Sequence, residues 1–411
     1  MSFYVISLMF AIPIFLLLIG IEAVVAGRMG IKVNHPADMI SSLSSGATNT
    51  LRNGINFGFI LISYSWLVNN LTIYKLEPMW LAVLIAFVIE DFAGYWIHRL
   101  NHRVNIFWNR HIIHHSSEEF NLSCALRQSI SDTVKFAAVF MIPAALLGIP
   151  QHIFTVIGPI HLFMQFWYHT RLIDKMGWLE KVIVTPSHHR VHHAINPEYI
   201  DKNYSQIFII WDKLFGSFQS ELPDVKPVYG ILRPADTWNP ILINFKHLWQ
   251  LIKDAIRTEN LLDKFKIWFM PTGWRPEDVS NKYPIKSIEI SRKQIKYETE
   301  NSRRLIFWSW TQMFIGLGLM FHLFFIISFN STPAILLYAL FLVLHVFGYT
   351  SLLDKSNFGM YSEGIKLIIG MALIIISDLT WFNSPNYVSI IMGFYFILSF
   401  SVTLYFIKTE L

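Results

Sequence analysis

The sequence predicts an all-α fold: a polytopic bundle of about eight or nine membrane helices with a histidine-rich helical cap that holds a two-metal site. Three observations predict it. Only 15% of the 411 residues are charged and 53% are hydrophobic, whereas a soluble domain has about 25% charged residues. Apolar stretches long enough to cross a bilayer recur along the chain. Nine of the sixteen histidines lie in three short clusters beside these stretches.

Residues 1–78 are predicted to form N-terminal membrane anchor helices. Phe3–Val25 is long for the apolar part of a signal peptide and lacks a basic start, so we expect it to be a retained membrane helix. Ile55–Ile73 is predicted as a second span. Residues 79–220 are predicted to form the domain that carries the histidine clusters, with spans at Trp80–Ile97, Val134–Leu147 and Ile153–Tyr168. The last two are short and are predicted to form a membrane hairpin or half-inserted helices.

The second half of the chain divides into an extramembrane part and a membrane part. Residues 221–304 have no long apolar run and many prolines, so we expect a segment outside the membrane, partly lying at its interface. Residues 305–411 are predicted to form a C-terminal membrane block without a histidine cluster. Its expected spans are Ile306–Ile327, Ala334–Tyr349, Gly364–Ile376 and Tyr387–Ile407.

Charge and cysteine content limit the partners and the compartment. A net charge of +5 fits basic loops at an anionic membrane surface, whereas a nucleic-acid binder needs a concentrated basic patch. Basic residues at 292–304 directly precede a predicted span, which places the histidine cap in the cytoplasm. Cys124 is the single cysteine, so neither an intrachain disulfide nor a multi-thiolate metal site is possible.

The first histidine cluster lies at the end of a predicted membrane helix. Asp91, Tyr95, His98 and His102 follow one another at helical spacing and share one face. A carboxylate inside a membrane is costly and suggests a function. We expect Asp91 to accept the second N–H of a metal-binding histidine and so to fix its tautomer.

The other two clusters repeat one spacing. His111, His114 and His115, and again His189, His192 and His193, occupy positions i, i+3 and i+4, where three rings can converge. So many imidazoles exceed the needs of one zinc ion, and two metals fit better. Imidazole suits zinc, copper, iron and nickel alike. A membrane setting suggests a lipid substrate, and oxidation of a lipid C–H bond requires redox-active iron. Zinc can occupy the same histidines but cannot carry out this oxidation.

This pattern, over about residues 81–218, resembles the fatty acid hydroxylase / sterol desaturase superfamily. The segments that carry the resemblance are the three histidine motifs together with Phe107–Trp108, Thr185–Val191, Asp201–Tyr204 and Trp211–Phe218. Residues 121–129 and the C-terminal block are most similar to the branch that cleaves ether lipids with tetrahydropterin. Arg103 departs from that branch, where an acidic residue is typical.

The resemblance implies a catalytic domain at 79–220 and a two-iron site that uses O2. It adds one ligand, His169, that spacing alone does not reveal. The nine expected ligands are His98, His102, His111, His114, His115, His169, His189, His192 and His193. Asp91, His188, Asp201 and Asn203 are expected to orient them, and Arg127 is expected to contact the polar head of the substrate.

The predicted function is a membrane-bound monooxygenase that hydroxylates a C–H bond of a fatty acyl, sterol or ether lipid. Electrons are expected from outside the chain, from tetrahydropterin or from a cytochrome- or ferredoxin-type partner, because no haem-binding motif of a fused cytochrome b5 domain occurs. Two alternatives stay open: a desaturase that uses the same irons, and a non-catalytic protein that binds or transports metal. The pattern predicts neither the native lipid nor the oligomeric state.

Overall fold

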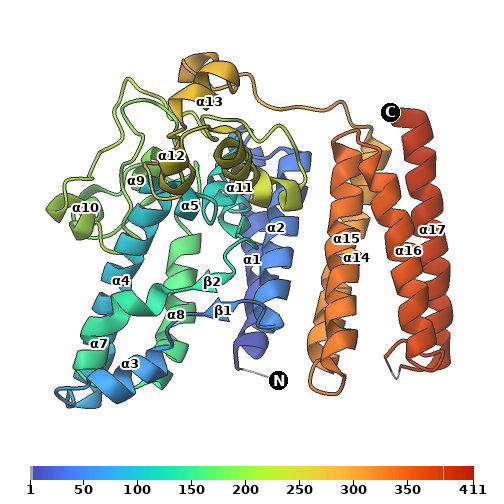
Figure 1. Ribbon diagram of the computed structural model, residues 1–411, viewed down its shortest axis with the longest axis horizontal. Helices are drawn as coiled ribbons and strands as arrows, with labels where there is room; N and C mark the ends of the chain where they lie inside the picture. The colour runs from blue at the N-terminus through green and yellow to red at the C-terminus, as the bar shows by residue number, and fades with distance from the viewer. Residues whose placement is uncertain (1–2, 383) are drawn as a thin grey trace.

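The computed structural model describes residues 3–382 and 384–411, and helices dominate it (Figure 1). Within these residues, six helices are long and apolar enough to cross a membrane. The protein is therefore a multi-pass membrane protein, although the expected eight or nine spans were too many. The six are α1 (Phe3–Met29), α4 (Met79–Arg103), α14 (Arg303–Ile326), α15 (Thr332–Leu353), α16 (Phe358–Ile376) and α17 (Asn386–Glu410).

The predicted span at Ile55–Ile73 is wrong. The chain instead forms α2 (Pro36–Gly54), a two-residue strand β1 (Phe59–Ile60) and the short helix α3 (Tyr64–Leu71). Gly58 has a φ of +151°, a conformation that breaks any helix there. The side chain of Ser63 then accepts a hydrogen bond from the backbone N–H of Trp66 and starts α3 as a new helix.

The two short predicted spans take a different form from a hairpin of two similar helices. The first contains strand β2 (Val134–Lys135), which pairs in parallel with β1, then a 3-10 helix (Ala137–Met141) and α7 (Ile142–Leu146). The second is α8 (Gln151–Phe166). Buried Ala82 and Ala86 of α4 pack with Ala144, Ile149 and Ile153 in one apolar cluster. Such small side chains let membrane helices approach closely.

The cap lies at one end of the bundle, at the top of Figure 1, and consists of short helices joined by long loops. Residues 221–304, predicted to be extramembrane, belong to this cap and contain no candidate span among the described residues. The cap helices are α5 (Asn105–Trp108), α6 (Ile112–His115), α9 (Pro186–His192), α10 (Ile210–Leu214), α11 (Pro240–Arg257), α12 (Leu261–Lys266), α13 (Glu277–Lys282) and 3-10 helices at Cys124–Leu126, Gly177–Lys181 and Ser291–Lys293.

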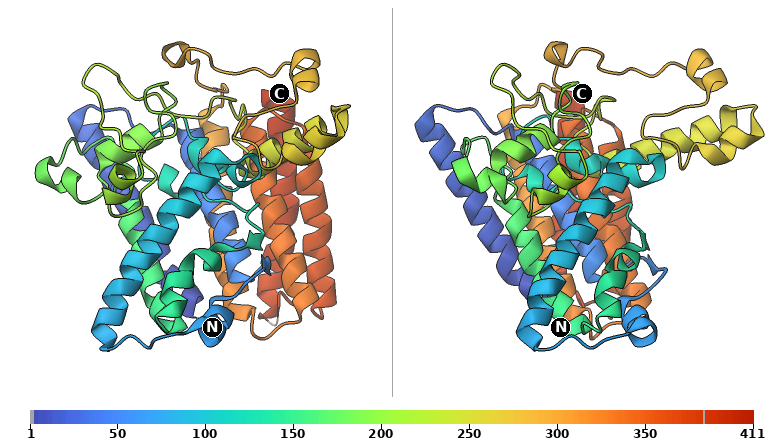
Figure 2. Two further views of the ribbon diagram at one scale, coloured as in Figure 1. Left: turned by 60° about the vertical axis from the view of Figure 1, so that its left-hand side comes forward. Right: turned by 90° about the vertical axis from the view of Figure 1, so that its left-hand side faces the viewer.

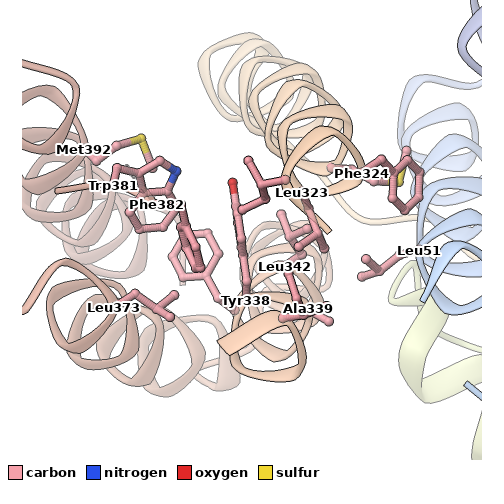
Figure 3. Packing of buried hydrophobic residues seen from close by; sticks show 14 of the residues in the cluster. Leu51, Leu323, Phe324, Tyr338, Ala339, Leu342, Leu373, Trp381, Phe382 and Met392 are labelled. Atoms are coloured by element: carbon pink, nitrogen blue, oxygen red, sulfur yellow. The ribbon is translucent and has the colours of Figure 1, made fainter. Parts of the chain in front are cut away.

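The C-terminal block of α14 to α17 stands beside the N-terminal bundle, and most of one large apolar cluster lies within this block (Figures 1 and 3). Aromatic rings fill this core, and Tyr338 stacks on Phe382 with ring centroids 4.9 Å apart. Leu51 of α2 belongs to the same cluster as Phe324 of α14. The two bundles therefore share one continuous apolar interior.

A buried polar cluster also joins the four C-terminal helices. Lys366 of α16 forms an ion pair of 2.6 Å with Glu363 and donates to Ser399 of α17 at 2.9 Å. His345 of α15 lies 2.8 Å from the backbone oxygen of Gln312 in α14. Hydrogen bonds thus offset the cost of placing these groups among membrane helices.

Candidate metal centre

The first cluster sits where α4 leaves the bundle and enters the cap. His98 and His102 occupy its last two turns, and Asp91, Tyr95, His98 and His102 are all buried, as expected for residues on one stripe. The Tyr95 hydroxyl lies 2.8 Å from the Ser217 hydroxyl, which attaches α4 to the loop after α10. The cap end of α4 is thereby fixed with its two imidazoles pointing into the protein.

The second cluster follows one turn of irregular chain after α5. His111 precedes α6, and His114 and His115 form its last two residues. The ring centroid of His111 lies 5.0 Å from that of His114 and 4.8 Å from that of His115. The expected convergence at positions i, i+3 and i+4 therefore occurs.

The third cluster lies on α9, whose start is well defined. Thr185 is its N-cap and Pro186 its first residue, an arrangement in which proline loses no helical hydrogen bond. His189, His192 and His193 follow on the buried side. His169, three residues beyond the end of α8, reaches the same place, and its Nε2 lies 2.8 Å from Nε2 of His189.

All nine predicted ligands meet in two adjacent groups. In each group the candidate ligand nitrogens lie within 4.8 Å of one another. The groups are bridged by direct ring contacts: His115 of one stacks on His193 of the other with centroids 4.2 Å apart. The first group is His98, His102, His111, His115 and His192, and the second is His114, His169, His189 and His193.

Backbone carbonyls determine which ring nitrogen is free. Nδ1 of His114 lies 3.2 Å from the oxygen of Arg127, and Nδ1 of His169 lies 3.0 Å from that of Gln165. A carbonyl oxygen only accepts, so each Nδ1 carries the proton and each Nε2 presents a lone pair. The first group repeats this arrangement with Nδ1 of His98 at 2.7 Å from the oxygen of Tyr204 and Nδ1 of His192 at 3.0 Å from that of Lys202.

The free nitrogens lie in an arrangement that only a cation can stabilise. Nε2 of His114 faces Nε2 of His169 at 3.3 Å, and two lone pairs at this distance repel each other. Nε2 of His102, His115 and His192 is buried and has no hydrogen-bond partner among the described residues. Buried polar atoms are normally satisfied, and converging imidazole lone pairs are metal-ligand chemistry. The residues present therefore fit two metal ions.

Burial keeps the rings neutral, which metal binding also requires. It lowers the pKa of His114 to about 3, and it holds the pKa values of His115 and His193 well below the ordinary 6.5. Neighbouring imidazoles depress these values further, because a second positive charge in the cluster is unfavourable. The cap histidines are therefore present as neutral ligands at physiological pH.

Asp91 does not contact any of the nine histidines, contrary to the expectation. Its Oδ1 accepts hydrogen bonds from Nε2 of His161 at 3.1 Å and from the backbone N–H of Ile207 at 2.9 Å. Its Oδ2 accepts from the N–H of Phe208 and from the indole of Trp211. Asp91 thus fixes the loop before α10 and also holds His161 of α8, so it supports the ligands through the surrounding scaffold and not by direct contact.

His188, Asp201 and Asn203 also act through the backbone. His188 caps the start of α9 beside Thr185. Asp201 forms an ion pair of 2.8 Å with Arg103, and Asn203 accepts from the N–H of Gln219 at 2.8 Å. Asp201 and Asn203 both have positive φ, 60° and 56°, and the bend they form presents the carbonyls of Lys202 and Tyr204 to the histidines.

Arg127 is not placed to bind a substrate. It is 2% exposed, and its Nη2 forms an ion pair of 2.7 Å with Asp38 of α2. Its Nη1 donates to Ser116, directly after the second cluster, at 2.8 Å. The expectation of a head-group contact is therefore wrong, because the hydrogen bonds of the Arg127 side chain are made inside the scaffold that supports His114.

A cavity of about 470 Å³ adjoins the histidines on the cap side, within the size range of ligand pockets. Four of the nine rings line it: His102, His115, His192 and His193. Its walls are largely apolar, with Trp108, Ile112 and Ile231 among them. The helix α11 closes one side, a contribution that the sequence pattern did not reveal because α11 carries no recognisable motif.

Nine imidazoles, eight of them buried, converge in two groups at the cap end of a membrane-helix bundle, and each group could hold a metal ion. The family model for fatty acid hydroxylase matches residues 83–217, which include every expected ligand. The chain belongs to the fatty acid hydroxylase family and is an oxidoreductase. The predicted resemblance is confirmed.

Similar proteins extend over most of the chain. Alkylglycerol monooxygenase of Homo sapiens is 34% identical over 370 residues, which is 88% of this chain and 81% of that protein. Alkylglycerol monooxygenase of Danio rerio is 40% identical over 252 residues, 60% of this chain and 54% of that protein. Delta(7)-sterol 5(6)-desaturase ERG3B of Gibberella zeae is 28% identical over 182 residues, 41% of this chain and 51% of that protein. No solved structure matches the chain.

Proposed function

We propose that the protein is a di-iron monooxygenase that hydroxylates a lipid C–H bond with O2, and that its substrate is an ether lipid. The observation that carries the proposal is the convergence of nine neutral imidazoles, with free nitrogens, beside an apolar cavity. The names of the similar proteins, alkylglycerol monooxygenases, support an ether lipid as the substrate class. Iron is favoured among the imidazole-binding metals because the reaction is an oxidation.

The reaction balances as one lipid C–H bond, O2, two electrons and two protons giving an alcohol and water. The bound irons would supply the activation of O2 and the removal of hydrogen. Hydroxylation of the carbon next to an ether oxygen gives a hemiacetal, which separates into an aldehyde and an alcohol. The two electrons come from a donor outside the chain, and tetrahydropterin or a cytochrome- or ferredoxin-type protein has the required chemistry.

The residues of the chain have three tasks in this proposal. The nine histidines hold the metals, and the carbonyls of Tyr204 and Arg127 keep the rings of His98 and His114 in the binding tautomer. The cavity walls place the alkyl chain against the histidines. Trp108 and Ile112 among these walls also exclude water from the reacting carbon.

The orientation of the cap is part of the proposal. Arg292, Lys293 and Lys296 lie in the segment that leads to α14 on the cap side of the bundle, and α14 itself begins with Arg303 and Arg304. Basic residues that flank membrane helices favour the cytoplasmic side, so the cap and its metal centre face the cytoplasm. A soluble reductant or a cytoplasmic electron-transfer protein then has direct access.

A desaturase is the second candidate, because the similar proteins include sterol desaturases. Both reactions begin by removing hydrogen from the same lipid, so product mass separates them. Hydroxylation adds one oxygen, which carries the label when the gas is ¹⁸O2, whereas desaturation removes two hydrogens and incorporates no label.

The first experiment is metal analysis of detergent-purified protein, for wild type and for His114→Ala/His192→Ala. These two residues belong to different ligand groups. We expect about two irons per chain in the wild type, lost in the variant. Zinc from expression is removed and replaced by iron before turnover of an alkylglycerol is measured. Absence of bound metal under every loading condition would exclude the proposed chemistry.

A further inference from the structure

The cavity beside the metal centre carries an excess of positive charge. Four cations line it, Arg103, Arg233, Lys246 and Lys253, but only one acid, Asp201. Asp201 is paired with Arg103, so the other three cations are not neutralised by an ion pair among the described residues. This is an unusual lining for a cavity that is otherwise mostly apolar.

The three remaining cations have donors to spare. Arg233 uses Nη2 to donate to the backbone oxygen of Gly273 at 2.7 Å. Lys246 donates to the backbone oxygens of Pro234 and Ala235 at 2.8 and 2.6 Å. Carbonyl oxygens hold these side chains in place but do not cancel their charge. Arg233 and Lys246 are thereby held in place by neutral groups, and their positive charges remain available to bind an anion.

The helix α11 connects this cavity to the outer surface. One of its faces, with Ile243, His247 and Leu251, is buried against the cap. The opposite face exposes apolar side chains, and Trp249 is 59% exposed although it also lines the cavity. The mouth of the cavity therefore opens at the exposed apolar face of α11.

That apolar face continues onto α12. Leu261, Leu262 and Phe265 are exposed, Phe265 by 74%, and Lys264 and Lys266 stand beside them. Figure 2 shows α11 and α12, in yellow, projecting sideways from the top of the bundle, at the end of the membrane-crossing helices. Exposed apolar residues flanked by lysines at this level are typical of helices that lie in an anionic membrane surface.

We infer that the cavity is a lipid entrance that opens to the membrane surface beside α11 and that it selects a lipid with an anionic head group through Arg233, Lys246 and Lys253. This inference rests on the proposed function, because the alkyl chain of such a lipid reaches the histidines. It adds a substrate class, ether lipids with a phosphate head group. It also adds a route, in which the lipid slides from the leaflet past Trp249.

The first arm of the test measures whether α11 and α12 enter the membrane. Cys124 is 1% exposed and is the single cysteine, so an introduced cysteine is labelled selectively. A fluorophore is placed at Phe245→Cys and Phe265→Cys, and at Ile295→Cys, which is 92% exposed but lies outside both helices. In vesicles of phosphatidylcholine and phosphatidylserine, we expect brominated lipid to quench the first two labels and aqueous iodide to quench the third. Equal quenching by iodide at all three positions would overturn the membrane-facing entrance.

The second arm measures head-group selection as binding, not as turnover. The iron-loaded protein in detergent is titrated with 1-alkylglycerol 3-phosphate and with neutral 1-alkylglycerol of the same chain length. We expect the phosphate lipid to bind about tenfold more tightly, and Lys253→Gln or Arg233→Gln to reduce this preference while leaving the neutral lipid unaffected. Lys175→Gln is the matched control, because Lys175 is exposed and is not one of the residues that line the cavity.

Three outcomes would contradict head-group selection: no preference in the wild type, an equal loss for both lipids in the variants, or competition by glycerol 3-phosphate at the same concentration as the lipid. The last result would identify a site for a soluble anion. A failure of the proposed function has a different signature, because the binding preference would persist while no oxidised product formed.

Discussion

Replacing Arg127 by methionine is expected to destabilise the scaffold of the metal centre strongly. Arg127 and Asp38 are each 2% exposed, and their ion pair measures 2.7 Å. Arg127 also donates to Ser42 at 2.9 Å and to Ser116 at 2.8 Å. Methionine fills a similar volume but leaves the carboxylate of Asp38 buried without a counter-charge, which costs about 3–5 kcal/mol.

The assay is denaturant unfolding in detergent micelles, with the free energy of unfolding compared between variants. Arg103→Met is the control, because its ion pair with Asp201 is partly exposed to solvent and is worth about 0–1 kcal/mol. The double variant Asp38→Leu/Arg127→Met removes both charges and should recover part of the loss. If Arg127→Met cost no more than Arg103→Met, the reasoning about the buried pair would be refuted.

Three further predictions concern the metal, pH and packing. His193→Ala is expected to lose about half of the bound metal, because it removes one ligand of the four-histidine group. His247→Ala changes a histidine outside both groups and should retain the metal. Equal metal content of the two variants by elemental analysis would contradict the ligand assignment. Burial lowers the pKa values of the cap histidines, so below about pH 6.5 the unfolded chain binds more protons than the metal-free folded chain. The stability of metal-free protein should therefore decrease as the pH falls from 6.5 toward 3, and a flat unfolding profile between pH 7 and 5 would be inconsistent with neutral buried rings. Gly370→Ala places a Cβ 2.5 Å from the ring of Phe396 and should cost about 1–3 kcal/mol, whereas Gly364→Ala, whose Cβ meets its nearest neighbour at 3.6 Å, should be nearly neutral in the same unfolding assay.

The histidine ligands were predictable because their signal is local. Positions i, i+3 and i+4 share a helix face whatever the rest of the fold does, and the short helix α6 and the helix α9 realise that spacing. His169 is different, since it meets His189 only because the tertiary fold brings the chain after α8 to α9. A lone histidine at a helix end carries no such spacing, and only the family resemblance revealed it.

The membrane spans were predictable where the apolar run was uninterrupted. All four C-terminal spans and α4 occur near their expected ranges. The range Ile55–Ile73 has a similar composition, but its strand β1 pairs with β2 from a distant part of the chain. Average hydropathy does not contain that long-range pairing.

The buried polar cluster of the C-terminal block escaped prediction for a related reason. Glu363 and Lys366 lie three residues apart on α16, whereas His345 stands among apolar residues of α15. The polar cluster forms only when α15 and α16 pack together, which places the ammonium of Lys366 3.2 Å from Nδ1 of His345. Residues dispersed over several helices form a cluster that no single window of sequence displays.

Two of the four residues expected to orient the ligands, Asp91 and Asp201, are carboxylates, and the structure places carboxylates one step further from the histidines. Asp212 is fully buried and accepts the N–H groups of Tyr204 and Ser205, each at 2.8 Å. It thereby fixes the carbonyl of Tyr204 that orients His98, just as the pair of Asp38 and Arg127 supports the carbonyl that orients His114. Every residue has a backbone carbonyl, so the carbonyls that orient the histidines cannot be recognised in the sequence. The aspartates that fix these carbonyls can be recognised. A buried aspartate near a histidine motif is therefore better interpreted as the anchor of a carbonyl-bearing loop than as a direct partner of the ligand.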